Sequence, residues 1–202
     1  QIVSLVETLR KTSTPVAGAR VEVIPRQQMT DYEPLPVSGQ GGHTRAFLKI
    51  QDGCDRFCSY CIIPYARGPV RSRPAPDALE EVRRLVAEGF SEFVLTGIHL
   101  ASYRDGTGKP SLLPLLREMD GVGGVRRIRL GSMEPFTLTP AFLDELTGIR
   151  ALCPHFHISL QSGSAGVLAR MNRRYSPEQY LQMLRELRAR FTDLSVTTDV
   201  MV

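Results

Sequence analysis

Short runs of alternating apolar and polar residues recur along the chain, separated by longer amphipathic stretches. Strict alternation predicts a strand, and apolar residues at three- and four-residue spacing predict a helix. The expected strands are Arg45–Gln51, Glu92–Ile98, Arg126–Leu130, His155–Gln161 and Leu194–Val202. The expected helices are Asp77–Gly89, Leu112–Met119, Thr139–Thr147, Ala165–Met171 and Pro177–Arg190. Asp77 is the expected N-cap of the first helix and Gly89 its C-cap. Strands and helices that alternate in this way predict an α/β fold with a parallel sheet and helical crossovers.

Three of the four cysteines stand close together in the run GCDRFCSYC, where Cys54, Cys58 and Cys61 form a C-x₃-C-x₂-C pattern. Thiolates are soft ligands suited to iron–sulfur clusters or zinc. Three of them can hold three corners of a [4Fe–4S] cluster and leave one iron open. A zinc site stays an alternative, with His43 as the nearest imidazole, although structural zinc usually takes four ligands. The distant Cys153 is expected to be a small core residue.

Four segments of the chain resemble the radical S-adenosylmethionine (SAM) methylthiotransferases, in the order found in that family. They are RAFLKIQDGCDRFCSYCIIPYARGPVRSRP (Arg45 to Pro74), HISLQSGS (His157 to Ser164), MNRRYS (Met171 to Ser176) and TTDVMV (Thr197 to Val202). The stretch IPYARGPVRSRP and the segment MNRRYS are most similar to the branch that modifies threonylcarbamoyladenosine in tRNA. The resemblance implies a partial (β/α)₆ radical-SAM barrel, of which five strands are visible.

The same resemblance implies a domain arrangement and partners. Residues 1–42 are expected to be the tail of an N-terminal methylthiotransferase domain plus a linker, and residues 43–202 a radical SAM core truncated at its C-terminus. The implied cofactors are a [4Fe–4S] cluster, S-adenosyl-L-methionine, and a second [4Fe–4S] cluster in the missing N-terminal domain. The implied partners are tRNA and an external one-electron donor, in the cytoplasm and without a membrane. The sequence carries no signal for oligomeric state.

Candidate site residues follow from the resemblance to the family and from positions at the ends of expected strands. Cys54, Cys58 and Cys61 would ligate the cluster, and no catalytic residue is expected beyond the cluster and cofactor site. The residues expected to bind S-adenosylmethionine are Tyr60 beside the adenine, Thr96 and Gly97 at the methionyl amine, Gln161 and Asp199 at the ribose, Arg173 at the carboxylate, and Glu134. The neighbouring Arg174 is the alternative to Arg173.

The strand faces suggest where a charged ligand would lie. Side chains alternate between the lumen and the helix layer of a parallel barrel. In the expected strand His155–Gln161 the even-numbered residues are apolar and the odd-numbered residues polar, and Leu194–Val202 and Arg45–Gln51 show a similar division. Apolar faces should pack under helices, so the polar faces should point into the lumen. An open sheet with one solvated face is the alternative.

The expected reaction adds a methylthio group to C2 of N6-threonylcarbamoyladenosine in a tRNA anticodon loop. Because that base carries a carboxylate, cations are expected at the mouth of the lumen. The candidates are Arg127 and Arg129 on one strand, and Arg67, Arg71 and Arg73 after the cysteines. Alternative substrates are isopentenyladenosine tRNA and an aspartate of a ribosomal protein. An alternative of another class is a non-catalytic zinc- or RNA-binding module.

Composition adds little to this picture. The chain has 202 residues, 42% of them hydrophobic, which is enough for one domain with a substantial core. No apolar run approaches the roughly 18 residues of a membrane helix. The net charge of +4 permits an anionic partner such as nucleic acid.

Overall fold

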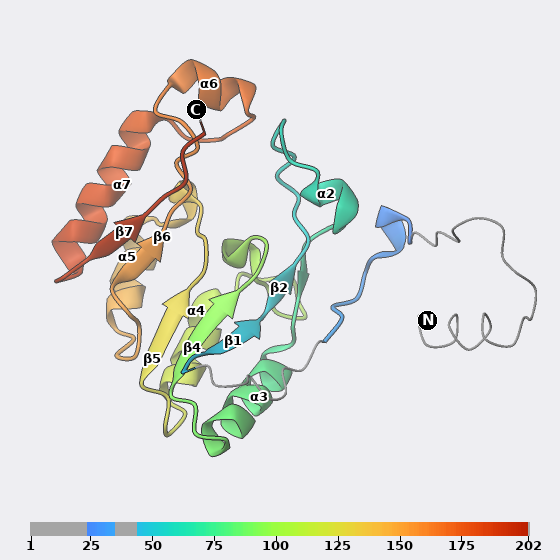
Figure 1. Cartoon of the computed structure of the whole chain (residues 1–202), viewed down its shortest axis with the longest axis vertical. Helices are drawn as coiled ribbons and strands as arrows, with labels where there is room; N and C mark the ends of the chain where they lie inside the picture. Colours follow the sequence, from blue (N-terminus) through green and yellow to red (C-terminus); the bar gives the residue numbers. More distant parts are fainter. Residues whose placement is uncertain (1–23, 35–43, 202) are drawn as a thin grey trace, which may run out of the picture.

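A parallel sheet forms the centre of the protein in the computed structural model, which describes residues 24–34 and 44–201. Within these residues five parallel strands follow one another in the order β1, β4, β5, β6, β7 (Figure 1). Bridges from Ile128 to Leu152 and from Met133 to Ile158 join β5 to β6. The strands are β1 (Ala46–Lys49), β4 (Glu92–Thr96), β5 (Arg127–Leu130), β6 (His155–His157) and β7 (Ser195–Thr197). The expected partial barrel is therefore confirmed, with strands shorter than predicted.

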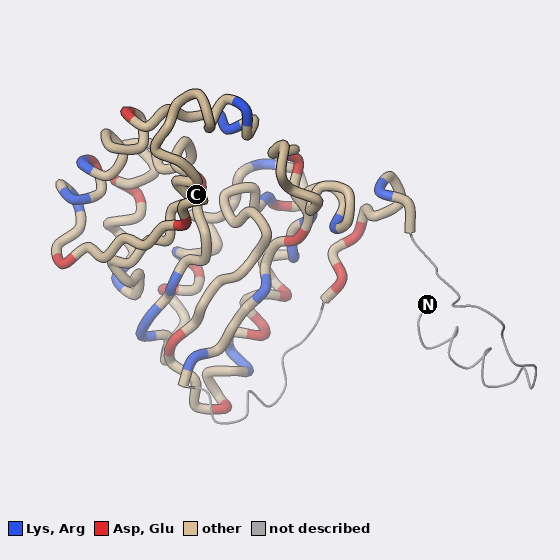
Figure 2. The backbone as a smooth tube through the Cα atoms, turned by 45° about the horizontal axis from the view of Figure 1, so that its top comes forward, with Lys and Arg blue, Asp and Glu red and all other residues tan. Residues whose placement is uncertain are grey.

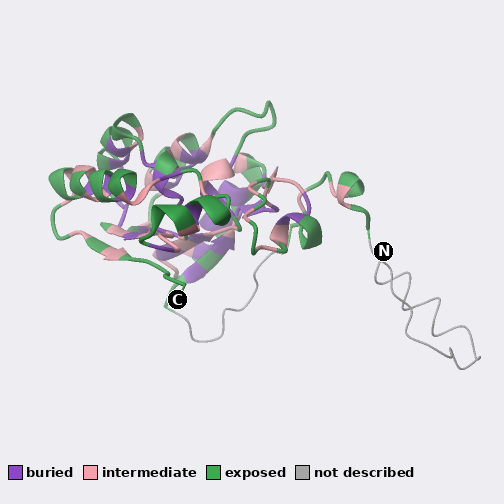
Figure 3. Ribbon diagram, turned by 90° about the horizontal axis from the view of Figure 1, so that it is seen from above, coloured by how far each residue is buried: buried purple, intermediate pink, exposed green. Residues whose placement is uncertain are grey.

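Helices cover one face of this sheet and bury its apolar side chains (Figure 3). They are α3 (Ala75–Ala87), α4 (Leu112–Asp120), α5 (Pro140–Thr147) and α7 (Pro177–Arg190). The short helix α6 (Ala165–Arg170) lies beyond the carboxyl ends of β6 and β7 (Figure 1). Short 3₁₀ helices η2 (Leu100–Ser102) and η3 (Pro135–Thr137) precede α4 and α5. Leu48, Phe93, Ile128 and Phe156 have no exposed surface, as the alternation predicts for the helix-facing positions. Their burial is the main stabilisation of the sheet–helix interface.

The polar strand faces lie opposite this core. His157 on β6 is within hydrogen-bonding distance of Thr197 on β7, 3.0 Å between Nδ1 and Oγ1, so the two side chains share a face. The predicted division of His155–Gln161 into two faces is thereby confirmed. The apolar face predicted for the last strand is incomplete, because Val200 is 52% exposed.

Helix ends follow local chemistry. α7 begins as expected at Pro177, after a capping box in which Ser176 and Gln179 bond each other's backbone. The prediction that Asp77 caps α3 is wrong: the helix begins two residues earlier, at Ala75, and Asp77 lies in its first turn. The physical reason is Pro76, since a proline in the first turn has its φ angle already set for a helix and lacks only an N–H that would be unpaired there. Gly89, the predicted C-cap, follows the observed C-cap Glu88 and has φ of 97°.

Residues 1–23 and 35–42 of the expected N-terminal tail and linker lie outside the described residues, as does His43. The described part, residues 24–34, contains the 3₁₀ helix η1 (Arg26–Gln28). Its Tyr32 hydroxyl donates to the carbonyl of Lys49 over 2.7 Å, so this stretch packs against the end of β1. Across the described chain, no helix combines the length and apolar character needed to cross a membrane.

Candidate metal and cofactor site

The three clustered cysteines lie on one loop, residues 53–70, which we call the thiol loop. Strands β2 (Gln51–Asp52) and β3 (Arg71–Ser72) pair antiparallel at its base, a hairpin that the sequence patterns did not predict. The amide of Cys54 donates to the carbonyl of Gly68 over 3.1 Å. Gly53 has φ of 71°, and a Cβ there would lie 1.8 Å from the carbonyl oxygen of Pro69. Only glycine fits this close approach.

A buried carboxylate fixes the same base. Asp52 accepts from the amide of Gly53 over 2.8 Å and forms ion pairs with Lys49 at 2.7 Å and Arg67 at 2.9 Å. Arg71 lies 3.5 Å away. Burial alone would raise the pKa of Asp52, but the hydrogen bonds from Lys49 and Arg67 outweigh it and lower that pKa to about 2. Arg67 and Arg71, predicted as mouth cations, therefore brace the loop base.

The other side of the thiol loop is attached to the C-terminal end of α6. Ser59 donates from its amide to the carbonyl of Met171 over 3.1 Å and from its hydroxyl to that of Arg170 over 2.8 Å. Asn172 returns a hydrogen bond from its side chain to the carbonyl of Phe57 over 3.0 Å. The short helix α2 (Ile63–Ala66) completes the loop. The thiols are thus held between two parts of the fold.

All three thiols line one cavity of about 240 Å³, which we call the thiol cavity. It lies at the carboxyl ends of β4, β5 and β6, where parallel sheets bind their ligands. Its other walls are Arg56, Tyr60, Ile63, Ile98, His99, Ser132, Glu134, Ser159, Gln161 and Arg173. The burial of Cys54, together with the nearby charge of Glu134, raises the pKa of its thiol.

Glu134 is the centre of the charged part of the cavity. Its carboxylate lies 2.8 Å from Nε2 of His99, 3.0 Å from Nε of Arg56 and 3.1 Å from Nη1 of Arg173. Burial raises the pKa of Glu134, but the hydrogen bond from His99 and the charges of His99, Arg173 and Arg56 overcome this and hold the pKa below its usual value. Glu134 therefore organises two guanidinium groups around the thiols.

One N–H donor group of Arg173 has no hydrogen-bond partner among the described residues. Its Nη1 also lies 3.2 Å from the sulfur of Cys58, and its Nε donates to the hydroxyl of Tyr175 over 3.2 Å. Its Nη2 is buried and, among the described residues, has no hydrogen-bond partner. An unpaired buried donor is costly, by about 1–3 kcal/mol. A carboxylate bound in the cavity would satisfy it, since a guanidinium can bond such a group with two parallel hydrogen bonds.

The structure brings together most of the predicted site residues. Those that line the thiol cavity are Cys54, Cys58, Cys61, Tyr60, Glu134, Gln161 and Arg173. Gln161 adopts a positive φ of 66° as its amide bonds the carbonyl of Asp199. Tyr60 is 46% exposed, and burial of the rest of its side chain raises its pKa.

Three other predicted residues are not in its walls. The carbonyl of Thr96 accepts from the amide of Ile50, and Gly97 packs so closely on Gln51 that a Cβ would lie 2.9 Å from that side chain. A carboxylate oxygen of Asp199 lies 3.2 Å from Nε2 of His157, and the Asp199 side chain is 70% exposed.

Arg127 and Arg129, predicted at the mouth of the lumen, do not lie near the thiols. Both pair with Glu92, at 3.4 and 2.5 Å, and Arg45 joins them at 3.0 Å. Glu92 is the first residue of β4, so this cluster lies at the opposite end of the strands from the thiol cavity. Figure 2 shows such charges of both signs interspersed along the chain. The alternation that placed both arginines on one strand face gave no information about which end of the barrel they would reach.

Arg73 and Arg174, two other arginines considered in the sequence analysis, also lie away from the thiol cavity. Arg73 is buried and hydrogen-bonded to Glu81 of α3, so it does not reach the mouth. Arg174 lines a separate cavity beside α7, which leaves Arg173 as the arginine of the thiol cavity.

The sequence patterns missed two charged or titratable residues of the cavity, Arg56 and His99. Arg56 stands between Cys54 and Cys58, and its guanidinium stacks 4.2 Å from the ring centre of Phe136. His99 follows Gly97 by two residues, within the loop after β4. Their positions close to the cysteine motif and to a strand end were the available signals.

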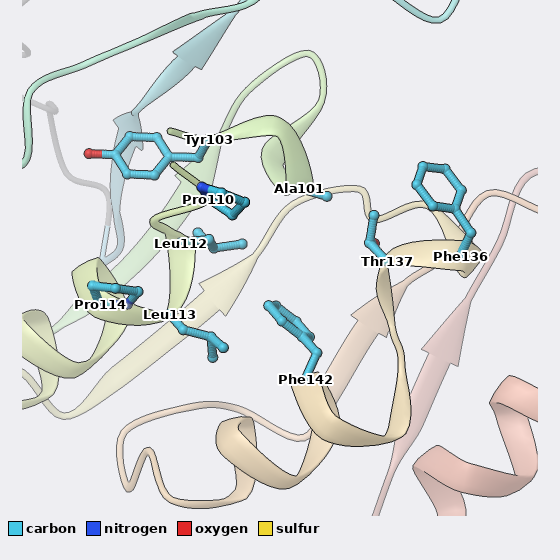
Figure 4. A pocket seen from close by; sticks show the side chains of 9 residues that line it. All are labelled: Ala101, Tyr103, Pro110, Leu112, Leu113, Pro114, Phe136, Thr137 and Phe142. Atoms are coloured by element: carbon cyan, nitrogen blue, oxygen red, sulfur yellow. The ribbon is translucent and has the colours of Figure 1, made fainter. Parts of the chain in front are cut away.

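A second cavity, of about 300 Å³, lies between the segments leading into α4 and α5 (Figure 4). Figure 4 shows Phe136 and Phe142 on one side of it and Pro110 and Leu113 on the other. None of its nine lining residues is charged. It therefore lacks the groups that a charged cofactor needs, and the thiol cavity is the candidate site.

Cys153 lies away from the other thiols. It precedes β6, its amide donates to the carbonyl of Ile128 over 2.9 Å, and burial raises the pKa of its thiol. The expectation of a buried core position is confirmed, with 8% of Cys153 exposed.

In residues 24–34 and 44–201, no three His, Cys, Asp or Glu side chains are grouped closely enough to hold a single metal ion.

Curated proteins of similar sequence share one kind of name. The chain is 42% identical to a threonylcarbamoyladenosine tRNA methylthiotransferase MtaB from Chlamydia pneumoniae, covering 86% of the chain and 41% of that relative. It is also 42% identical to the MtaB of Bacillus subtilis, covering 85% of the chain and 38% of that protein. A tRNA-2-methylthio-N(6)-dimethylallyladenosine synthase from Carboxydothermus hydrogenoformans is 40% identical, covering 84% of the chain and 39% of the relative. The chain thus spans about two fifths of the length of these relatives.

Solved structures of the same fold include the radical S-adenosylmethionine methyltransferase TsrM from Kitasatospora setae. It has a TM-score of 0.61 at 20% identity, and the match covers 77% of the chain and 30% of TsrM. The cobalamin-dependent enzyme OxsB has a TM-score of 0.62 at 13% identity, covering 77% of the chain and 23% of OxsB. The sequence model of the radical SAM superfamily matches residues 48–202, more than half of the chain. The chain therefore belongs to the radical SAM superfamily.

Proposed function

We propose that this chain is the core of a radical SAM methylthiotransferase that adds a methylthio group to C2 of N6-threonylcarbamoyladenosine in a tRNA anticodon loop. The observation that carries the proposal is the thiol cavity, in which three thiols share a wall with Arg173 and its unpaired Nη2. Two relatives named as threonylcarbamoyladenosine tRNA methylthiotransferases support the reaction and the substrate.

The donor set fits a [4Fe–4S] cluster and S-adenosylmethionine. The sulfurs of Cys54, Cys58 and Cys61 would hold three irons, and Arg173 would bind the methionyl carboxylate through its unpaired Nη2. Gln161 would bind a ribose hydroxyl. Together the bound groups supply hydrogen-atom abstraction from a C–H bond, here that of adenine C2.

Other cofactor contacts stay predictions from the family resemblance. Tyr60 would border the adenine, and the backbone at Thr96 and Gly97 would meet the methionyl amine. Asp199 would reach the ribose only after leaving His157, with which it pairs at 3.2 Å. Glu134 would act chiefly by holding Arg173.

The charge of the cavity favours an anionic substrate group. Arg56 and Arg173 share the single carboxylate of Glu134, so apart from the three thiols, which would be cluster ligands, the cavity walls have two guanidinium groups and one carboxylate. We propose that Arg56, rather than Arg127 or Arg129, binds the carboxylate of the threonylcarbamoyl arm. An isopentenyl arm carries no charge and would gain nothing from this guanidinium, although a relative named for dimethylallyladenosine is 40% identical.

The remaining parts of the proposal concern the whole protein. Residues 1–42 would lead from an N-terminal domain with a second [4Fe–4S] cluster, residues 43–202 would form the core, and an external one-electron donor would reduce the cluster. A tRNA substrate and reduced thiols fit a cytoplasmic location.

The experiment is to offer the full-length enzyme, reconstituted without oxygen, two tRNAs that carry threonylcarbamoyladenosine or isopentenyladenosine, and to measure nucleosides by mass spectrometry. A methylthio mass on threonylcarbamoyladenosine is expected. The mass on isopentenyladenosine alone would overturn the substrate while leaving the reaction class. No methylthio product on either would overturn the function.

A further inference from the structure

His99 joins two parts of the site that are distant in sequence. Its backbone amide donates to Oε1 of Gln51 over 2.6 Å, and its imidazole Nε2 lies 2.8 Å from Glu134. The side chain is buried, with only 5% of the residue exposed. His99, in the loop after β4, therefore contacts both β2, which leads into the thiol loop, and the Glu134 carboxylate, which holds Arg56 and Arg173.

The contact with Gln51 places the backbone of His99. The side chain of Gln51 is fully buried, and its Nε2 donates to the carbonyls of Asp52 and Gly53, each over 2.7 Å. The side-chain amide of Gln51 thus bonds both Gly53, which precedes Cys54, and His99, in the loop after β4. The imidazole is consequently held at a fixed position relative to the base of the thiol loop.

The contact with Glu134 requires a proton on Nε2 of His99. An ionised carboxylate only accepts hydrogen bonds, so Nε2 of His99 is the donor. Nδ1 is hydrogen-bonded to the hydroxyl of Ser102, which can act as donor or acceptor in this contact. With both ring nitrogens occupied, the imidazole can neither rotate nor release Glu134 without losing a buried hydrogen bond.

We propose that His99 is a positioning residue that, by donating from Nε2 to Glu134, orients Arg173 for the carboxylate of S-adenosylmethionine. The inference rests on the proposed function. Glu134 has three partners in the cavity, and His99 is the one that carries no fixed positive charge. Without it, the carboxylate would be free to move towards Arg56 or Arg173 and would no longer fix the direction of the unpaired Nη2.

The test uses two amide side chains that separate the two ring nitrogens. In the full-length, reconstituted enzyme, His99→Gln places an amide donor near the position of Nε2, and His99→Asn places one near Nδ1. We expect His99→Gln to bind S-adenosylmethionine within about threefold of the unchanged enzyme, and His99→Asn about ten- to a hundredfold more weakly, by anaerobic calorimetry. Ser102→Ala is the matched control, because it removes only the Nδ1 contact, and it should bind normally.

Two readouts separate positioning from a general loss of structure. Iron content should equal that of the unchanged enzyme in all three variants. The change that S-adenosylmethionine causes in the electron paramagnetic resonance spectrum of the reduced cluster should persist in His99→Gln and be lost in His99→Asn at the same ligand concentration. A general packing role would affect both variants alike, so equal affinity of His99→Asn and His99→Gln would overturn the inference, as would loss of iron in both.

A double substitution provides a second route. If His99 acts through Glu134, the variant His99→Asn with Glu134→Gln should bind no more weakly than Glu134→Gln alone. Additive losses would contradict the inference. Failure of the unchanged enzyme to bind iron or S-adenosylmethionine would instead overturn the proposed function.

Discussion

The guanidinium of Arg173 lies 3.2 Å from the sulfur of Cys58, although 115 residues separate them in the chain. The same guanidinium holds Glu134 at 3.1 Å. The proposed cluster ligand and the proposed carboxylate-binding group are therefore in direct contact. Cofactor affinity and the geometry at Cys58 should respond together to changes at this arginine.

Replacing Arg173 by Gln should weaken the binding of S-adenosylmethionine about ten- to a hundredfold, because charged hydrogen bonds of this kind contribute about 1.5–3 kcal/mol. Anaerobic calorimetry on the reconstituted enzyme measures this affinity. Arg174→Gln is the control, since Arg174 lines a different cavity. Equal losses in the two variants would contradict the assignment of Arg173.

Replacing Cys54, Cys58 or Cys61 by Ala should abolish the loading of about four irons per site, because a cluster with only two thiolates is poorly held. Iron analysis of the full-length protein after anaerobic reconstitution measures the effect, as a loss of about four irons relative to the unchanged protein. Cys153→Ala should load normally, since Cys153 is buried before β6. Loss of iron from Cys153→Ala would contradict the three-thiol site.

Gly53→Ala should displace the base of the thiol loop, because the added Cβ would lie 1.8 Å from the carbonyl oxygen of Pro69 and φ is 71°. Strain of this kind costs about 1–3 kcal/mol. We expect a lower free energy of unfolding and incomplete iron loading. Gly106→Ala, where a Cβ would meet nothing within 4 Å, should change neither quantity. Normal loading of Gly53→Ala would show that the loop tolerates a shifted base.

The ion cluster around Glu92 should make stability depend on pH. The hydrogen bond from Arg129 lowers the pKa of Glu92 against the opposing effect of burial, with further lowering by the charges of Arg129, Arg45 and Arg127. A carboxyl group whose pKa is lower in the folded state stabilises the protein above its unfolded-state pKa, and this contribution is lost as the pH falls through the folded-state pKa.

Glu92→Gln should accordingly lower the free energy of unfolding by about 1–2 kcal/mol at pH 7. The difference from the unchanged protein should shrink as the pH falls below about 4, the usual carboxyl range, because Glu92 then becomes neutral as well. Urea unfolding at several pH values measures this. A difference that stays constant from pH 7 to pH 3 would contradict the role of the ionised carboxylate.

Arg56→Gln should weaken the binding of an anticodon hairpin that carries threonylcarbamoyladenosine by about tenfold, because it removes a charged partner for the carboxylate. Binding of a hairpin with isopentenyladenosine should change less. Fluorescence anisotropy of the two labelled hairpins with the full-length enzyme measures both. Equal weakening of both would assign Arg56 to general RNA contacts.

The repeating part of the fold was predictable from the sequence, because local patterns determine it. Leu48, Ile128 and Phe156 are buried where the alternation places the helix-facing side chains, and α7 begins and ends at the predicted residues. The start of α3 was misjudged because Asp77 is a good N-cap residue and Pro76 an equally good first-turn residue. In the structure, the helix begins at Ala75, so that Pro76 occupies its first turn.

The position of a candidate-site residue was predictable where the residue belongs to a sequence motif. It was not predictable where a partner distant in the chain determines that position. The three cysteines and Arg173 line one cavity as the family segments suggested. Arg127 and Arg129 could not be placed, since their partner Glu92 lies 35 and 37 residues away in the chain. His99 was missed for the same reason, because its contacts are with Gln51 of β2 and with Glu134 in the segment after β5.

The attachment of Ser59 to α6 also bears on how the protein is made. The carbonyl of Arg170 that receives the hydroxyl of Ser59 lies 111 residues further along the chain. At a synthesis rate of about 5–20 residues per second, the cysteines leave the ribosome on the order of ten seconds before this support exists. A cluster delivered during synthesis would therefore meet a loop with one side unattached. Stable insertion should follow the release of the finished core from the ribosome.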